Sequence, residues 1–174
     1  MRRLALTLLA TLTLAVSLPA TTLQKLSLDD MIQQSSRVVR ARVTGARTAL
    51  RGADIFTFYQ IQVIENWKSD GPQLEVAVPG GAARGVRQTV AGAPQLQVGE
   101  EYVLFLWTSR SGLTQVMGLG QGLFSVKADA SGTMMLIRPA AAETMLDQNG
   151  RVVADQPLNL KLNDVRQRVG QAAK

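Results

Sequence analysis

The 174-residue sequence contains no cysteine and no histidine. A chain without cysteine forms no disulfide, and a chain without either residue lacks the ligands of the common structural zinc sites. The same absences exclude Ser-His-Asp and Cys-His nucleophilic sites, together with acid–base catalysis by imidazole. Stability is therefore expected to come from a packed hydrophobic core alone, and the enzymatic chemistry left to weigh uses carboxylates or a lysine.

Neither remaining chemistry has a recognisable motif. Glu100 and Glu101 are sequence neighbours that would point to opposite faces of a strand, while Asp29 and Asp30 suit the cap and dipole of a helix start. A Ser-Lys dyad would need a lysine beside a serine motif. We predict that the protein is not an enzyme and holds no metal or cofactor, with a hydrolase using carboxylates or lysine as an alternative. The lysines fall in links, at turns or on exposed faces: Lys25, Lys68, Lys127, Lys161 and Lys174.

The first twenty residues have the layout of a secretory signal peptide. Two arginines precede an apolar run at 4–18, which is about 15 residues long and so shorter than the roughly 20 of a membrane span. Cleavage is expected after Ala20 or, alternatively, after Ser17. No later run is apolar and long enough to span a bilayer. The protein is predicted to be exported, periplasmic or extracellular, with no transmembrane anchor after cleavage.

Cleavage after Ala20 would leave 154 of the 174 residues and lower the net charge from +6 to +4. A chain of that length suits one domain with one hydrophobic core. A mature charge this small does not indicate nucleic-acid binding.

Alternating hydrophobic residues predict a mainly β chain. A short helix is expected at 27–35, where Ser27 can cap the amide of Asp30. The segment EYVLFLWTS at 101–109 is apolar on both faces, which is typical of a central strand. The other expected strands lie at 37–46, 54–67 and 73–79 and in hairpins at 123–138 and 143–155.

Turn residues predict the connections. The glycine-rich segment 80–94 is expected to be a long exposed loop. The first hairpin should turn at 129–132, and the pair Asn149-Gly150 suits a two-residue type I′ turn in the second. Asn163 is placed to cap a short C-terminal helix.

The glycine-rich stretch GLGQG at 118–122 differs from a phosphate-binding loop because its spacing is G-x-G-x-G and it lies between strands. Alternate glycines there favour a bulge or tight corner close to another backbone or to a large side chain such as Trp107. The core is expected to gather in one barrel, comprising Val39, Val43, Ile61, Val63, Val76, Leu104, Leu106 and Phe124.

From Leu26 to about Val126 the expected order is helix, strand, long strand running into ENWKSDGP, strand, loop and QVGEEYVLFL. This order resembles the netrin-like or tissue-inhibitor-of-metalloprotease module, a five-stranded OB-type barrel. The chain is also similar to exported bacterial proteins of unknown function that share the patterns at Gly99–Leu106 and Gly118–Phe124. Inhibitors of that family chelate the protease zinc through an N-terminal cysteine, so the resemblance implies only a shared fold here.

The expected architecture is a five-stranded OB-like (netrin-like) barrel with a short N-terminal helix, extended by a C-terminal β-hairpin and short helix. The signal peptide would occupy 1–20 and the barrel domain 21–138. The hairpin and helix at 139–174 would pack on the barrel, because so short a segment cannot bury a core of its own.

Arginines provide the first candidate ligand-binding surface. Arg40 and Arg42 lie two apart on an expected strand and share a face, which suits bidentate hydrogen bonds to phosphate or carboxylate groups. Arg84 and Arg87 in the 80–94 loop would make a second contact. The same arginines also suit a solvated outer face, and both interpretations stay open.

Aromatic residues provide the second candidate surface. Tyr59 and Trp67 near the end of a strand suit a platform for an oligosaccharide, and core packing is the alternative.

The sequence thus predicts an exported, non-catalytic binding or interaction module of unknown ligand. Its partner would be an envelope or extracellular protein, or an anionic glycan or lipid. An envelope structural component, which would oligomerise through exposed strand edges, is the alternative.

Overall fold

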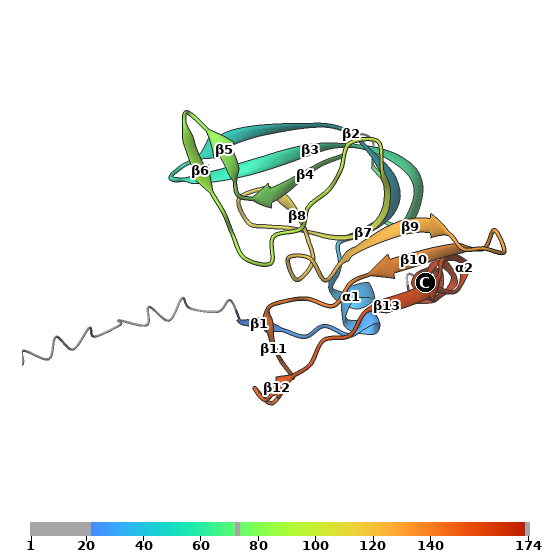
Figure 1. Cartoon of the computed structure of the whole chain (residues 1–174). Helices are drawn as coiled ribbons and strands as arrows, with labels where there is room; N and C mark the ends of the chain where they lie inside the picture. The colour runs from blue at the N-terminus through green and yellow to red at the C-terminus, as the bar shows by residue number, and fades with distance from the viewer. Residues whose placement is uncertain (1–21, 72–73, 173–174) are drawn as a thin grey trace, which may run out of the picture.

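The computed structural model describes residues 22–71 and 74–172, and the predicted leader lies outside these residues. The described chain is mainly β with two helices, as predicted (Figure 1). Most strands join one large antiparallel sheet. Its members are β2 (Arg37–Arg51), β3 (Asp54–Lys68), β4 (Leu74–Pro79), β7 (Glu101–Thr108), β8 (Thr114–Val116), β9 (Leu123–Ala128), β10 (Met134–Arg138) and β13 (Leu158–Lys161).

The strand order across this sheet is β13-β10-β9-β7-β2-β3-β4, and β8 pairs with β7 outside that path. The half formed by β7, β2, β3 and β4 curls until β4 approaches β8 (Figure 1). Between the described parts of β4 and β8 there is no hydrogen-bonded ladder, so the sheet is open. The expected five-stranded OB-like barrel is therefore not confirmed.

The remaining strands form two small sheets. β1 (Thr22–Gln24) pairs in parallel with β11 (Thr144–Leu146), which also pairs with β12 (Val152–Val153). The hairpin of β5 (Gly81–Ala83) and β6 (Val86–Gln88) occupies much of the segment expected to be a loop. That expectation is wrong for these residues, because the Thr48 hydroxyl of β2 donates to the Ala82 carbonyl of the hairpin, and the Gln88 side chain of the hairpin accepts from the Ile55 amide of β3.

Both predicted helices are present. α1 (Leu28–Gln34) begins with a capping box. Ser27 caps the amide of Asp30, as predicted, and the Asp30 carboxylate also accepts from the Ser27 amide. α2 (Leu162–Ala172) buries Val165 and Val169 against the sheet. The predicted cap is wrong, because α2 starts at Leu162, two residues before the start that a cap at Asn163 requires, and Asn163 lies inside its first turn.

β-Bulges interrupt the alternation between β2 and β3. The pairing register shifts at three places along 38–45 of β2. A bulge adds an unpaired residue and re-aims the side chains that follow it. Consequently Ile61 and Trp67 of β3 belong to different hydrophobic clusters, although their spacing in a regular strand would place them on one face.

The core has two clusters, one on each face of β7. Tyr102, Leu104 and Leu106 face the inside of the curl, while Val103 and Phe105 face the helices, as predicted for a central strand. We call the first the curled-sheet cluster; its buried members are Val39, Ala41, Val43, Ile61, Leu74, Val76, Val78, Leu96, Tyr102, Leu104, Leu106 and Val116. We call the second the helix-backed cluster; its buried members are Met31, Ile32, Val38, Trp67, Val103, Phe105, Met117, Phe124, Val126, Leu136, Leu162, Val165 and Val169.

The expectation of one common core is correct for most of its eight residues. Val63 packs against the curled-sheet cluster but is only partly buried. Phe124 is wrongly placed, because it packs edge-on against Phe105 at 5.7 Å in the helix-backed cluster.

Three hairpins share one turn chemistry, with Ser or Asp first and glycine fourth: 109–112, 129–132 and 147–150. In the last, the Gly150 amide donates to the Asp147 carbonyl, and only Gly150 of the expected Asn149-Gly150 pair has a positive φ, +75°. This is a type I turn followed by a left-handed glycine. The type I′ prediction is therefore wrong, since Asp147 fixes the turn by accepting from the amides of Asn149 and Arg151. The predicted turn at 129–132 is confirmed.

Candidate functional site

The Arg40–Arg42 surface is occupied by the protein's own carboxylates. Arg40 donates from Nε to Glu101 at 2.5 Å and from its terminal nitrogen to Glu65 at 2.8 Å. Arg42 lies on the same side, 3.6 Å from Glu101, with half of its side chain exposed. Arg166 of α2 completes the chain at 3.3 Å from Glu65. The predicted shared face of the two arginines is confirmed, but its charge is largely compensated.

Hydrogen bonds keep this network charged. Burial opposes ionisation of Glu65, but hydrogen bonds from Trp67 and Arg40 and the nearby charge of Arg166 outweigh it and lower the pKa of Glu65. Burial likewise opposes the charge on Arg40, and its bonds to Glu101 and Glu65 raise the Arg40 pKa instead. An anion approaching Arg40 would have to displace a charged, hydrogen-bonded carboxylate.

The two aromatic candidates do not form a platform. Trp67 is 9% exposed, lies in the helix-backed cluster and donates from Nε1 to Glu65 at 3.1 Å. Tyr59 packs on the other cluster, where burial raises its pKa. The core-packing alternative is therefore the correct one for Trp67.

Arg84 and Arg87 are exposed on the β5–β6 hairpin. This hairpin is held on the sheet by Thr48, whose hydroxyl donates to the Ala82 carbonyl at 2.6 Å. The eight residue steps of β2 from Arg40 to Thr48, at about 3.3 Å each, span up to roughly 25 Å. The structure thus separates the two arginine pairs that the sequence predicts to share one ligand-binding surface.

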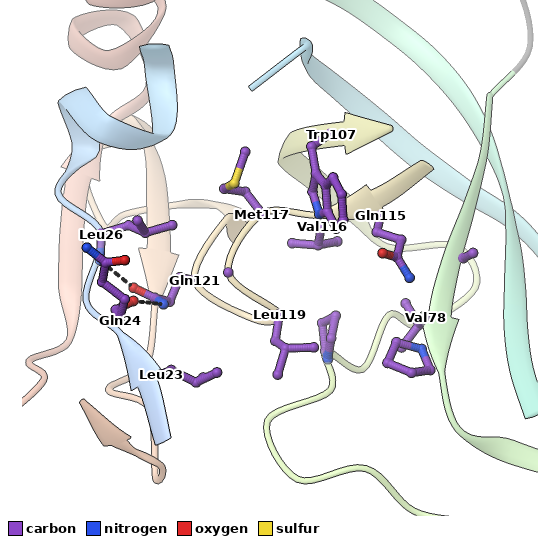
Figure 2. A pocket seen from close by; sticks show the side chains of 14 residues that line it. Leu23, Gln24, Leu26, Val78, Trp107, Gln115, Val116, Met117, Leu119 and Gln121 are labelled. Atoms are coloured by element: carbon purple, nitrogen blue, oxygen red, sulfur yellow. Dashed lines mark hydrogen bonds between the residues drawn. The ribbon is translucent and has the colours of Figure 1, made fainter. Parts of the chain in front are cut away.

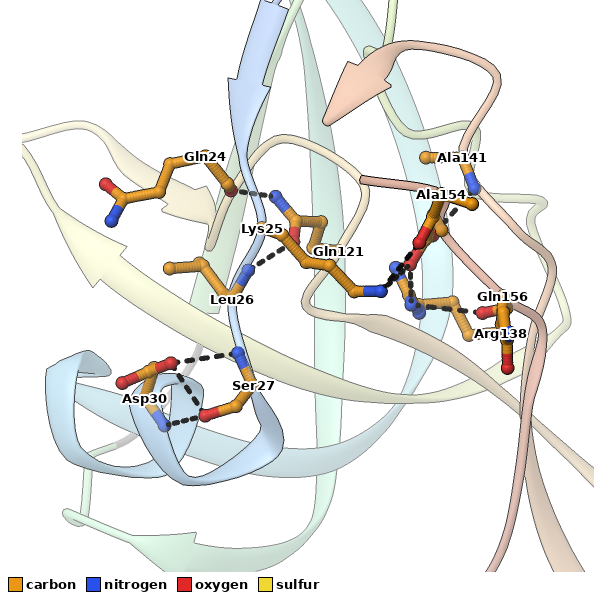
Figure 3. A network of polar contacts seen from close by, with 11 residues as sticks. Gln24, Lys25, Leu26, Ser27, Asp30, Gln121, Arg138, Ala141, Ala154 and Gln156 are labelled. Carbon is orange, nitrogen blue, oxygen red and sulfur yellow. Dashed lines mark hydrogen bonds and ion pairs between the residues drawn. The ribbon is translucent and has the colours of Figure 1, made fainter. Parts of the chain in front are cut away.

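The GLGQG corner holds the N-terminal strand in place. Gln121 is 2% exposed, and its side chain accepts from the Leu26 amide at 2.8 Å and donates to the Gln24 carbonyl at 2.9 Å (Figure 3). The expected close approach is present at Gly122, where an added Cβ would lie 2.9 Å from the Phe105 carbonyl oxygen. The neighbouring side chain is Phe105 rather than the expected Trp107.

A buried ion pair fastens the C-terminal segment beside this strand (Figure 3). Arg138 donates to Asp155 at 3.1 Å, and their side chains are 7% and 2% exposed. Asp155 also accepts from the Ala141 amide at 2.8 Å. Burial opposes its ionisation, but these hydrogen bonds and the Arg138 charge outweigh it, so the pKa of Asp155 is lowered.

An apolar groove lies where the curled sheet is open. It has a volume of about 420 Å³ and is bounded by β1, β4, the β7–β8 hairpin and the GLGQG corner (Figure 2). We call it the β4–β8 groove. Its apolar lining side chains include Leu23, Leu26, Val78, Pro79, Pro94, Trp107, Val116, Met117 and Leu119.

Leu119 projects into this groove from an unusual backbone conformation (Figure 2). Its φ is +57°, directly after Gly118 at +56°. The left-handed region costs a residue with a Cβ roughly 1–2 kcal/mol, and such strain tends to persist where a side chain must be held for binding. Trp107, at the same groove, is 38% exposed despite its size.

Sequence reasoning missed the groove because its walls come from four separate segments. The sequence predicts Trp107 and the GLGQG corner only as residues that pack closely. The one usable signal was an apolar leucine between two glycines, at a position where a turn favours a small or polar residue.

Within residues 22–71 and 74–172 there is no group of three or more acidic side chains placed to hold a metal ion. No helix in the same ranges is long and apolar enough to cross a membrane. Comparisons of the chain with protein-family models, with curated proteins and with solved structures each gave no match.

Proposed function

We propose that the chain is an exported, non-catalytic binding module built on an OB-like framework, and that the β4–β8 groove receives an apolar part of its ligand. The observation that carries the proposal is the groove itself, an apolar opening that holds a strained Leu119 and a half-exposed Trp107. Ligand sites are typically concave and mostly apolar, with a few polar groups that orient the ligand. Gln24 and Gln115 supply such groups here.

The strand arrangement supports the OB-like part of the proposal. Going round the curl, β2, β3, β4, β8 and β7 follow one another and return to β2, and only the β4–β8 side lacks a ladder. OB domains are five-stranded and partly open barrels. The netrin-like resemblance of the sequence implies the same framework, with the groove at its open side.

The state of the carboxylates favours binding over hydrolysis. Glu65 and Glu101 are brought near each other because Arg40 binds both carboxylates. A general acid needs a raised pKa, whereas the pKa of Glu65 is lowered by its hydrogen bonds. These residues are better suited to joining β2, β3, β7 and α2 than to proton transfer.

Fluorescence can test the groove with 8-anilinonaphthalene-1-sulfonate as the apolar probe. The sequence has two tryptophans, so Trp67→Phe leaves Trp107 as the single donor of energy to the bound probe. In that background we expect energy transfer from Trp107. Leu119→Asn should weaken probe binding about tenfold, since a buried leucine contributes roughly 1.5–3 kcal/mol.

The substitution is chosen because asparagine tolerates a positive φ and so preserves the turn. Val152→Asn is the matched control, since Val152 is 73% exposed and lies away from the groove. Equal probe binding by the Leu119→Asn and Val152→Asn proteins would contradict the proposed site.

A further inference from the structure

Two tight hairpins meet at one end of the curled sheet. The β2–β3 hairpin turns at 52–53, and the β5–β6 hairpin turns at 84–85, next to it (Figure 1). We call residues 50–54 and 83–87 the double-hairpin tip. It carries two of the arginines that the sequence marked as candidates, Arg84 and Arg87.

Both turns are two residues long and therefore hold their side chains in fixed positions. Gly52 has a φ of +64°, which suits the first central position of a type II′ turn. Arg84 and Gly85 have φ values of +50° and +78°, the pattern of a type I′ turn. Asparagine or glycine is usual at the turn position that Arg84 occupies. An arginine in the left-handed region is less favourable in backbone free energy than either residue.

The tip presents uncompensated positive charge. Arg51, Arg84 and Arg87 are exposed, and none of them forms an ion pair or side-chain hydrogen bond with the rest of the described chain. Asp54 is the single acidic residue of the tip, which leaves a net charge of +2 from three arginines and one aspartate. Arg47, farther down β2, differs because Glu75 binds it at 2.8 Å.

Apolar side chains are exposed among these charges. Val86 is 60% and Leu50 38% exposed, and they border a hollow of about 450 Å³ between the two hairpins. Basic residues around protruding apolar side chains are the combination by which proteins lie on anionic membranes, with the apolar groups in the interface and the charges at the headgroups. An acidic polysaccharide would use the arginines but offers no apolar phase to Val86.

We propose that the double-hairpin tip docks the protein on an anionic lipid surface, with Val86 inserted and the three arginines at the lipid headgroups. The proposal is separate from ligand binding in the β4–β8 groove, because it rests on different residues. Either can fail while the other holds.

Vesicle co-sedimentation tests the charge requirement. The protein is mixed with vesicles of about one part phosphatidylglycerol to two parts phosphatidylcholine, or of phosphatidylcholine alone, at low and high salt. The double variant Arg84→Asn, Arg87→Gln keeps a residue suited to the type I′ turn. It should lose about 25-fold in partition coefficient, about fivefold for each arginine.

The matched control is Arg110→Gln, Arg151→Gln, which removes two exposed, unpaired arginines from other turns of the described chain. Every variant carries the same N-terminus, so any contribution of that end cancels. Equal losses in the two double variants would overturn the proposal, because net charge alone would then explain binding. Equal binding to both kinds of vesicle would overturn it as well.

A single introduced cysteine tests insertion. The chain has none of its own, so Val86→Cys can be labelled uniquely with nitrobenzoxadiazole. Its emission should shift to the blue on anionic vesicles, whereas a label at Val98→Cys, a site 58% exposed away from the tip, should not shift. No shift at position 86 would overturn insertion and leave an acidic polysaccharide or protein as the partner of the arginines.

Discussion

The two halves of the large sheet differ in what covers them and in how their surface charges are paired. The helix-backed half comprises β13, β10, β9 and β7, and the curled half comprises β7, β2, β3 and β4. The helix-backed half is covered by α1 and α2, and its surface arginines are paired: Arg168 with Asp29 at 2.7 Å and Arg166 with Glu65. The inner face of the curled half packs mainly against its own strands. It keeps an apolar groove and a tip of unpaired arginines. The difference indicates that the helix-backed half stabilises the molecule while the curled half is available for contacts.

The largest expected effects come from neighbouring residues of β7. Leu104 and Phe105 are both fully buried but belong to different clusters. Leu104→Ala should cost about 2–5 kcal/mol and Phe105→Ala about 3–5 kcal/mol in the free energy of unfolding, because each truncation leaves a cavity. Urea unfolding measures both. A loss below about 1 kcal/mol for either variant would mean that the cluster containing that residue contributes little to the stability of its half of the sheet.

The next effect tests the buried ion pair. Asp155→Asn should destabilise the protein by about 3 kcal/mol, since it leaves the Arg138 charge buried without its partner. Arg168→Gln breaks an exposed pair instead, and should cost less than about 1 kcal/mol. Similar losses for the two variants in thermal unfolding would contradict the buried character of the Arg138–Asp155 pair.

A smaller effect is expected where the two halves meet the GLGQG corner. Gly122→Ala places a methyl group 2.9 Å from the Phe105 carbonyl oxygen and 3.1 Å from the Met117 Cβ, so it should cost about 1–3 kcal/mol. Gly170→Ala is the matched control, because its Cβ would meet nothing within 4 Å. In a helix that change should stabilise by up to about 1 kcal/mol. An unchanged unfolding midpoint for Gly122→Ala would show that the corner can relax.

Local patterns in the sequence predicted the local structure well. The apolar run at 101–109 predicted a central strand buried on both faces, and Ser27 and Asp30 predicted the helix start. These predictions succeed because each depends on residues a few positions apart. The Asn149-Gly150 turn failed because the side chain of Asp147, outside the pair, fixes a different turn.

Predictions that needed tertiary placement were less successful. The bulges between β2 and β3 moved Trp67 into the helix-backed cluster, and nothing in the alternation of β3 marks where a bulge falls. Likewise, Arg40 is compensated by Glu65 and Glu101, which are far from it in sequence and lie beside it in the fold. A candidate ligand site depends on such distant neighbours, so composition alone cannot distinguish a paired arginine from a free one.

The smallest expected effect concerns Glu65, which joins the helix-backed half to β2. Its pKa in the folded protein lies below its ordinary value of 4.5. Its contribution to stability is therefore fully present above pH 4.5 and is lost as the pH falls through the lowered pKa, because the unfolded chain binds the proton more readily. Glu65→Gln should flatten the decline in unfolding free energy below pH 4.5 and cost no more than about 1 kcal/mol at neutral pH, since the pair is partly exposed. Gln34→Lys changes the net charge equally at an exposed position and should keep the wild-type slope. If urea unfolding across this pH range gave Glu65→Gln the same slope as the control, the ionised glutamate would not be what holds Arg40 and Arg166 together, and Glu101 would remain the carboxylate partner of Arg40.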